Sequence, residues 1–170
     1  MMMSGVKLKL ILKKDCLIWI GILLLSWYVS AYWYQLTLIQ GQSMYPTYRH
    51  HQLALLNKYE REYHRGDVVA FSCEGLSTVL IKRIVAGPGD TVVILDDDLL
   101  INGVQSEFYP EEDRFSYAGL LSNEILLAEG QYLVLGDNID ESIDSRYLEV
   151  GIISESDIIG KLITSRRDFN

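Results

Sequence analysis

The chain has 170 residues, a length that suits one domain with an appendage rather than two full domains. Hydrophobic residues make up 49% of it and charged residues 22%, which excludes general disorder and allows a sizeable core. Residues 1–42 carry a charge of +3, so with a total of −8 the remaining residues carry −11. Because binding to nucleic-acid phosphates needs a basic face, this acidic body argues against nucleic acid as a partner.

A long apolar segment lies near the start of the chain. The run from Cys16 to Tyr34 is uncharged and mostly apolar, with tyrosines and tryptophans gathered toward its end. About 20 helical residues cross a hydrocarbon core of about 30 Å, and the run extends easily to Leu38. We therefore expect a transmembrane anchor at residues 16–38.

The charges beside this segment predict its orientation. Four lysines lie within residues 1–15, and none follows the segment closely. By the positive-inside rule, we expect residues 1–15 to be a basic cytoplasmic N-terminus and residues 39–170 to be an extracytoplasmic domain of a single-pass cell-membrane protein. Two other interpretations stay open: a signal peptide cleaved near Val29-Ser30-Ala31, and a helix buried in the protein core.

Short runs with strand character follow, separated by turns. The runs occupy residues 52–56, 67–71, 78–85, 91–95, 99–101 and 132–135. Turn signals such as Gly87-Pro88-Gly89-Asp90 and Asn102-Gly103 close them. This punctuation predicts a mainly β fold, an antiparallel and barrel-like domain behind the N-terminal transmembrane helix. Residues 106–130 are less regular, and we expect them to form a small cap.

A candidate nucleophile lies just beyond the predicted membrane boundary. Ser43 stands in the segment from Gly41 to Thr47, where Pro46 fixes its own φ and restrains Tyr45, so a rigid, non-helical loop is expected. A serine on a stiff loop can act as a nucleophile if a base is present, while the alternative is a turn or capping serine. Three histidines are candidate bases: His50, His51 and His64. The sequence favours exposed loop residues over catalytic bases for them.

A lysine inside an apolar run is the more suggestive candidate base. Lys82 lies within residues 79–85, and neighbours on a strand face opposite sides, so Lys82 and Arg83 cannot both point outward and one is directed inward. Burial lowers the pKa of a lysine, and a neutral lysine can accept a proton from a serine. The alternative is a sheet-edge lysine whose stem reaches water.

A third polar segment follows the predicted strand at residues 132–135. It runs from Gly136 to Arg146 and is dense in hydrogen-bonding side chains. Asp144 and Arg146 can pair there, and Ser142 or Ser145 can orient a buried amine. The alternative is an Asx-rich turn.

These three segments, in this order behind an N-terminal anchor, resemble type I signal peptidases of the compact Gram-positive type. Ser43 to Thr47 is similar to the family's nucleophile motif, Lys82 to Asp90 to its general-base motif, and Gly136 to Arg146 to its third motif. The likeness covers the anchor and nearly all of the body. It implies the family's β catalytic domain and a serine endopeptidase.

The resemblance also implies roles for individual residues. Ser43 is the expected nucleophile and Lys82 the expected general base, with the Ser43 N–H stabilising the oxyanion. Ser142 is expected to orient the Lys82 amine. The salt bridge expected to support the site joins Asp144 to Arg146. The residues expected to line shallow pockets for small substrate side chains are Ile39, Met44 and Ile81.

The implied function is removal of signal peptides from exported preproteins after small residues, with no metal or nucleotide cofactor. The implied partners are these preproteins and membrane lipid, with pilus-assembly or translocation machinery as further candidates. Two rival functions stay open: a non-enzymatic, membrane-tethered factor in pilus assembly, and a self-cleaving regulator. Positions that depart from the family pattern, with an effect on activity that the sequence leaves open, are Gly41, Tyr48, Ile139 and Glu141.

Overall fold

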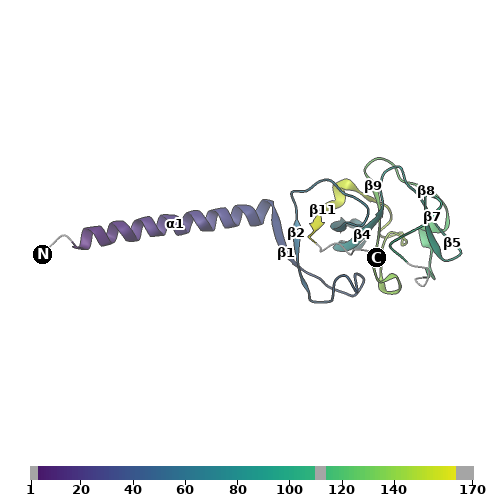
Figure 1. The fold of residues 1–170 in the computed structure, drawn as a ribbon, viewed down its shortest axis with the longest axis horizontal. Helices are drawn as coiled ribbons and strands as arrows, with labels where there is room; N and C mark the ends of the chain where they lie inside the picture. The colour runs from purple at the N-terminus through teal and green to yellow at the C-terminus, as the bar shows by residue number, and fades with distance from the viewer. Residues whose placement is uncertain (1–3, 110–113, 164–170) are drawn as a thin grey trace.

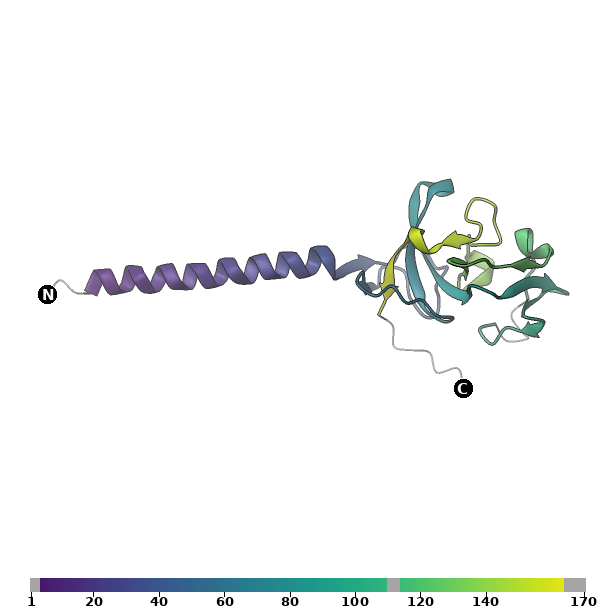
Figure 2. The same ribbon diagram turned by 90° about the horizontal axis from the view of Figure 1, so that it is seen from above.

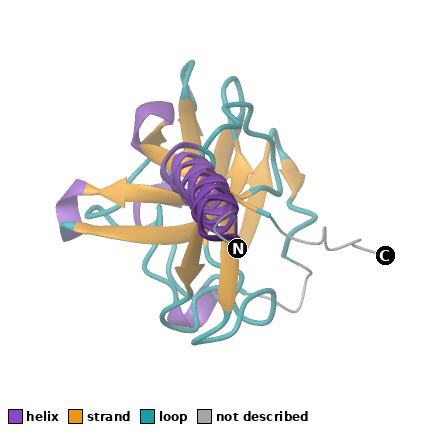
Figure 3. Cartoon of the chain, turned by 90° about the vertical axis from the view of Figure 1, so that its left-hand side faces the viewer, coloured by secondary structure: helices purple, strands orange, loops and turns teal. Residues whose placement is uncertain are grey.

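The computed structural model describes residues 4–109 and 114–163, with side chains from residue 15 onward. A 29-residue helix, α1 (Ser4–Tyr32), projects from a β body, with the N-terminus at its far end (Figures 1 and 2). Figure 3 looks along this helix toward the strands behind it. Within the described residues, α1 holds one stretch long and apolar enough to span a membrane, Asp15–Tyr32. None of that stretch is buried, so it is not a core helix of the body.

The helix ends earlier than the predicted anchor. Residues 34–38, expected within the membrane span, instead form strand β1 (Tyr34–Leu38), which pairs antiparallel with β2 (Leu53–Asn57). The chain leaves the helix at Trp33, whose carbonyl accepts a hydrogen bond from the Lys58 N–H at 2.8 Å. The sequence does not mark this boundary, because an apolar strand that continues an apolar helix carries no charge or proline to separate them.

Within the described residues, a seven-stranded antiparallel sheet forms the larger part of the body. Its strand order is β1-β2-β11-β3-β4-β9-β10. The bounds of its remaining strands are β3 Val68–Cys73, β4 Thr78–Ala86, β9 Gln131–Leu135, β10 Ile153–Ser154 and β11 Ile158–Leu162. Because β1 and β10 are open edges, the mainly antiparallel β fold is confirmed and barrel-like describes it only loosely.

A second antiparallel sheet, of four strands within the described residues, has the order β7-β6-β5-β8. Its strands are β5 Thr91–Leu95, β6 Asp98–Ile101, β7 Val104–Gln105 and β8 Ile125–Leu126. Two tight turns with paired positive φ values, at 96–97 and 102–103, join β5 to β6 and β6 to β7. The segment expected as a cap, 106–130, supplies β8 to this sheet, and 110–113 lie outside the described residues.

Short 3-10 turns complete the body: η1 Glu74–Leu76, η2 Gly119–Ser122, η3 Ile139–Glu141 and η4 Glu155–Asp157. One apolar core joins the small sheet to the ends of β4 and β9, through side chains such as Val85, Leu99 and Leu135. The small sheet is therefore packed against the strands that lead into the polar segments described next.

Candidate active site

Gly136 is the point at which two of the polar segments meet. It directly follows β9, and a Cβ atom placed on it would lie 2.3 Å from Ser142 Oγ and 2.6 Å from the Ser43 carbonyl oxygen. Real Cβ atoms do not approach neighbours that closely, so this position has room only for glycine. The sequence-predicted Ser43 and Ser142 are thus brought together, although 99 residues separate them in the chain.

The loop that carries Ser43 is held by hydrogen bonds along its backbone. The Asn138 N–H donates to the Ser43 carbonyl at 3.0 Å, and the Tyr48 N–H donates to the Met44 carbonyl at 2.8 Å. The Gly41 N–H donates to His50 Nδ1 at 3.0 Å. These bonds fix a compact, non-helical loop, as the sequence predicted, and leave Ser43 half-buried. His50 serves this loop as an acceptor rather than standing free as a base.

Lys82 is the central residue of β4 and is only 3% exposed. Burial lowers its pKa from 10.5 to about 8, with Arg146 adding to the lowering, whereas Asp144 and Asp137 oppose it. Among the described residues, Lys82 forms no ion pair within 4.0 Å. An amine with this pKa is about one tenth neutral at pH 7 and can therefore accept a proton.

Arg83 is buried as well, at 5% exposure, so both neighbouring cations are buried, whereas the sequence argument required only one of them to point inward. Alternation does send neighbouring side chains to opposite faces, but both faces of β4 are covered at this point. Arg83 Nε and Nη2 each donate to the Asp137 carboxylate at 2.7 Å, and Nη1 donates to the Gly66 carbonyl at 2.6 Å. Its Nη2 also reaches Thr47 Oγ1 at 3.2 Å.

Sequence reasoning missed this buried ion pair. Asp137 is 54 residues from Arg83 and stands in a segment with several acidic side chains, any of which could have been the partner of Arg83. A signal was available in part: an arginine inside an apolar strand needs a carboxylate partner when buried. The pair ties the loop of Ser43, through Thr47, to β4 and to the start of the third segment.

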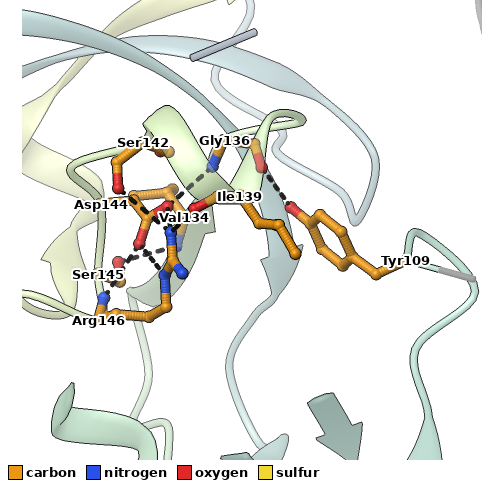
Figure 4. A network of polar contacts seen from close by, with 8 residues as sticks. All are labelled: Tyr109, Val134, Gly136, Ile139, Ser142, Asp144, Ser145 and Arg146. Atoms are coloured by element: carbon orange, nitrogen blue, oxygen red, sulfur yellow. Dashed lines mark hydrogen bonds and ion pairs between the residues drawn. The ribbon is translucent and has the colours of Figure 1, made fainter. Parts of the chain in front are cut away.

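The third segment is organised by the ion pair between Asp144 and Arg146, as the sequence predicted (Figure 4). Arg146 Nε and Nη2 donate to the two oxygens of the fully buried Asp144 at 2.8 and 2.9 Å. Arg146 Nη2 also donates to the Ile139 carbonyl at 2.7 Å. Ser145 Oγ accepts the Val134 N–H at 3.0 Å, so it anchors the segment to β9.

The hydrogen bond expected between Ser142 and Lys82 is not formed in this structure. Ser142 Oγ is buried and has no partner among the described residues. It lies beside Gly136, whose N–H and carbonyl are already bonded to Asp144 and Tyr109. Hydrogen bonds between catalytic groups often tighten only when substrate binds, and a buried hydroxyl without a partner is rare in a folded protein.

The three residues expected to line substrate pockets lie in one apolar cluster. Ile39 and Met44 are buried there, and the partly buried Ile81 packs against them. Tyr48, one of the departures from the family pattern, is buried in the same cluster. The other departures are not part of this cluster. Gly41 has a φ of +89°, and Glu141 is exposed. The Ile139 carbonyl accepts a hydrogen bond from the Arg146 guanidinium.

The family profile and the most similar sequences agree on one family. The family profile described as "Signal peptidase, peptidase S26" matches residues 12–165. The signal peptidase I P of Bacillus subtilis subsp. natto is 30% identical over 148 residues, covering 81% of this chain and 80% of that protein. The signal peptidase I T of Bacillus subtilis strain 168 is 33% identical over 147 residues, covering 81% and 76%. The crystal structure of a signal peptidase I from Enterococcus faecalis V583 is 28% identical with a TM-score of 0.49, covering 60% of this chain and 97% of that one.

Proposed function

The chain belongs to the signal peptidase family, peptidase S26, and we propose that it removes signal peptides from exported preproteins with a Ser43/Lys82 dyad. Its curated relatives are signal peptidase I enzymes, which makes it a serine peptidase of this family. The dyad, the roles of single residues and the membrane arrangement are our proposals. A loop serine combined with a buried lysine of lowered pKa suits acyl transfer without a metal.

The proposed reaction begins with attack of Ser43 Oγ on the carbonyl carbon of the scissile peptide bond. Lys82 Nζ accepts the hydroxyl proton, and the C–N bond then breaks as the departing amine of the mature protein takes that proton. The signal peptide stays attached to Ser43 as an ester. A water molecule that gives a proton to Lys82 attacks the ester carbonyl carbon, the bond from that carbon to Ser43 Oγ breaks, and Lys82 returns the proton to Ser43 Oγ as the signal peptide leaves as a carboxylic acid.

The observation that carries this proposal is the burial of Lys82 beside the third segment. Its pKa of about 8 lets the amine lose its proton near neutral pH, which an exposed lysine does not do. Burial is the main cause of this low pKa, and the charges that act on the amine besides burial, Asp144, Arg146 and Asp137, all belong to that segment. A lysine placed only for structure would gain from an ion pair, and within the described residues Lys82 has none within 4.0 Å.

Further residues complete the proposed site. Ser142 Oγ, buried without a partner among the described residues, is available to accept a hydrogen bond from the Lys82 amine and orient it. The Ser43 N–H is the proposed donor to the oxyanion, because it adjoins the reacting oxygen. Ile39, Met44 and Ile81 form the proposed pocket wall, and its close packing suits small substrate side chains.

The membrane arrangement follows from the charge pattern. We place residues 1–15 in the cytoplasm and the body outside, with the apolar stretch from Cys16 to Tyr32 as the span. An anchored enzyme and a membrane-inserted signal peptide share one plane, which raises their effective concentration. Membrane lipid and preproteins are the partners that this arrangement requires.

The test is cleavage of a preprotein with an Ala-x-Ala site by the full chain in detergent–lipid micelles. Ser43→Ala is expected to abolish cleavage with folding unchanged, because only the hydroxyl is lost. Ser122→Ala, at an exposed serine far along the chain, is the matched control and is expected to keep full activity. Cleavage by Ser43→Ala would place the nucleophile elsewhere. Absence of cleavage by the wild type would favour a non-enzymatic role in pilus assembly.

A further inference from the structure

We propose that Tyr109, which lies between strands β7 and β8 of the small sheet, is a positioning residue that fixes Gly136 and through it the two serines of the site. This inference rests on the proposed function. Tyr109 belongs to none of the three segments that sequence analysis selected. It is 3% exposed, and its hydroxyl donates to the Gly136 carbonyl at 3.0 Å (Figure 4).

The Gly136 backbone is held from both sides by buried side chains. Its N–H donates to Asp144 Oδ2 at 3.2 Å, and its carbonyl accepts the Tyr109 hydroxyl. These two bonds fix the orientation of both adjoining peptide planes. A shift of Gly136 would be transmitted at once, because the Ser142 side chain and the Ser43 carbonyl are packed directly against it.

Tyr109 also completes a closed circuit of contacts that starts and ends at Gly136. Its aromatic ring meets the edge of Phe115 at a centroid distance of 5.1 Å, and the Arg146 guanidinium lies over the Phe115 ring at 5.5 Å. Arg146 pairs with Asp144, and Asp144 accepts the Gly136 N–H. The residues between β7 and β8 therefore contact the third segment through this hydrogen bond and this cation–π contact, and also through the Leu120 N–H, which donates to the Arg146 carbonyl at 2.9 Å.

The chemistry of Tyr109 suits a permanent donor rather than a proton carrier. Burial raises its pKa well above the ordinary value, and Asp137 and Asp144 raise it further. The hydroxyl thus stays protonated throughout the working pH range and always donates. The same carboxylates and Arg146 are the charges that act on Lys82, so a movement of this segment also changes the surroundings of the amine.

Two buried tyrosines allow a matched experiment on the full chain. Tyr109→Phe removes only the hydroxyl that bonds to Gly136. Tyr63→Phe makes the same chemical change at a buried tyrosine whose hydroxyl has no partner among the described residues. Each variant is assayed for kcat and KM on the preprotein, and the titration of the Lys82 amine is followed by NMR with 13C-labelled lysine.

The Tyr109→Phe variant is expected to lose roughly fivefold in kcat, the effect of one hydrogen bond, with KM within about twofold of wild type. The midpoint of Lys82 is expected to move above about 8, because a loosened Gly136 admits water and burial is the largest cause of the low pKa. If Tyr109 had only a structural role, Tyr109→Phe would lower the thermal stability of the protein without moving the titration midpoint of Lys82. Tyr63→Phe is expected to change neither quantity.

Equal kcat and an equal Lys82 midpoint in the two variants would overturn the inference. If Tyr109→Phe fails to fold by circular dichroism, Phe115→Leu decides, since it loosens the same circuit of contacts and leaves the hydroxyl in place. An unmoved midpoint in that variant counts against the inference. If the wild type does not cleave, or Ser43→Ala does, the proposed function fails, while the NMR titration still decides the position of Tyr109.

Discussion

Two adjacent cations on β4, Lys82 and Arg83, are both buried and are compensated differently. Arg83 donates to the Asp137 carboxylate through two nitrogens, so its charge is retained at every working pH. Lys82 lacks such a partner among the described residues, and burial lowers its pKa to about 8. The strand therefore holds one permanent charge for structure and one removable proton, and the difference lies in which neighbour each side chain reaches.

The burial of Lys82 carries a cost that stability measurements can detect. A pKa lowered from 10.5 to about 8 corresponds to about 3 kcal/mol for keeping the amine charged in the folded protein. Lys82→Met is therefore expected to be inactive and more stable than wild type at pH 7 by about that amount. Denaturant unfolding in micelles, followed by circular dichroism, measures the difference.

The sign of the pH dependence follows from the same linkage. Between pH 8 and 10.5 the unfolded state binds more protons at residue 82 than the folded state does, so the stability of the wild type rises with pH there. The advantage of Lys82→Met is expected to shrink over that range and to vanish above it. A variant less stable than wild type at pH 7 would show that the ammonium is stabilised where it lies.

At the scale of elements, local sequence patterns predicted the strands that are short apolar runs bounded by clear turn signals. The run at 91–95 coincides with β5, and the turns that flank β6 carry the positive φ values that Asn, Asp and Gly tolerate. Strand β1 was not predicted, because it directly continues the apolar helix. Strand β11 was not predicted either. Its partners β2 and β3 lie about a hundred residues earlier, and pairing at such a distance leaves no local signal.

The candidate site was predictable to the extent that its chemistry is local. Ser43 beside a proline, Lys82 in an apolar run and the polar segment after 135 each stand out in the sequence. The contacts that join them do not, because Asp137 and Tyr109 look ordinary in their own surroundings. Their partners, Arg83 and the Gly136 carbonyl, are identified only by the fold.

The ion pair between β4 and the third segment gives a prediction at this scale. Arg83→Met and Asp137→Leu are each expected to destabilise the protein by about 3–5 kcal/mol, because each leaves a buried charge without its partner. The double variant is expected to lose less than the two single losses combined. The measurement is a double-mutant cycle of unfolding free energies.

A second ion pair supplies the control for that cycle. Arg114 and Asp98 are paired at 3.4 Å on the surface, with the Arg114 side chain 56% exposed. Replacing either with alanine is expected to cost less than about 1 kcal/mol. Additive losses in the buried pair would mean that Arg83 and Asp137 are stabilised independently of one another.

At the scale of the whole molecule, an exposed apolar helix leads directly into a β body that carries the site. Since β1 starts two residues after α1 ends, an anchored helix, as proposed, would leave the body little freedom to move away from the membrane surface. Under the proposed membrane arrangement, the site would then be held near the level at which a membrane-inserted substrate emerges. This placement gives the anchor a role in positioning as well as in attachment.

The predicted orientation can be tested by labelling in intact cells. Single cysteines are introduced as Ser4→Cys and as Glu129→Cys, the latter on the exposed surface of the body, after Cys16 and Cys73 are replaced by serine. An impermeant thiol reagent added outside is expected to label position 129 and not position 4. Labelling of position 4 alone would reverse the topology.

The central claim is that Lys82 acts as a base, and arginine is the substitution that isolates this role. Arginine keeps the positive charge but does not lose its proton in a protein. If Lys82 were a structural cation, Lys82→Arg would retain activity. If it is the base, Lys82→Arg is expected to be nearly as inactive as Lys82→Ala, although it folds.

The measurement is the rate of preprotein cleavage from pH 6 to 10 by wild type and Lys82→Arg, with folding checked by circular dichroism. The wild-type rate is expected to rise with pH through about 8 as the amine becomes neutral, and to fade in acid. Lys82→Arg is expected to show no cleavage across the range. A folded Lys82→Arg protein that cleaves within a few-fold of wild type would remove Lys82 from the mechanism.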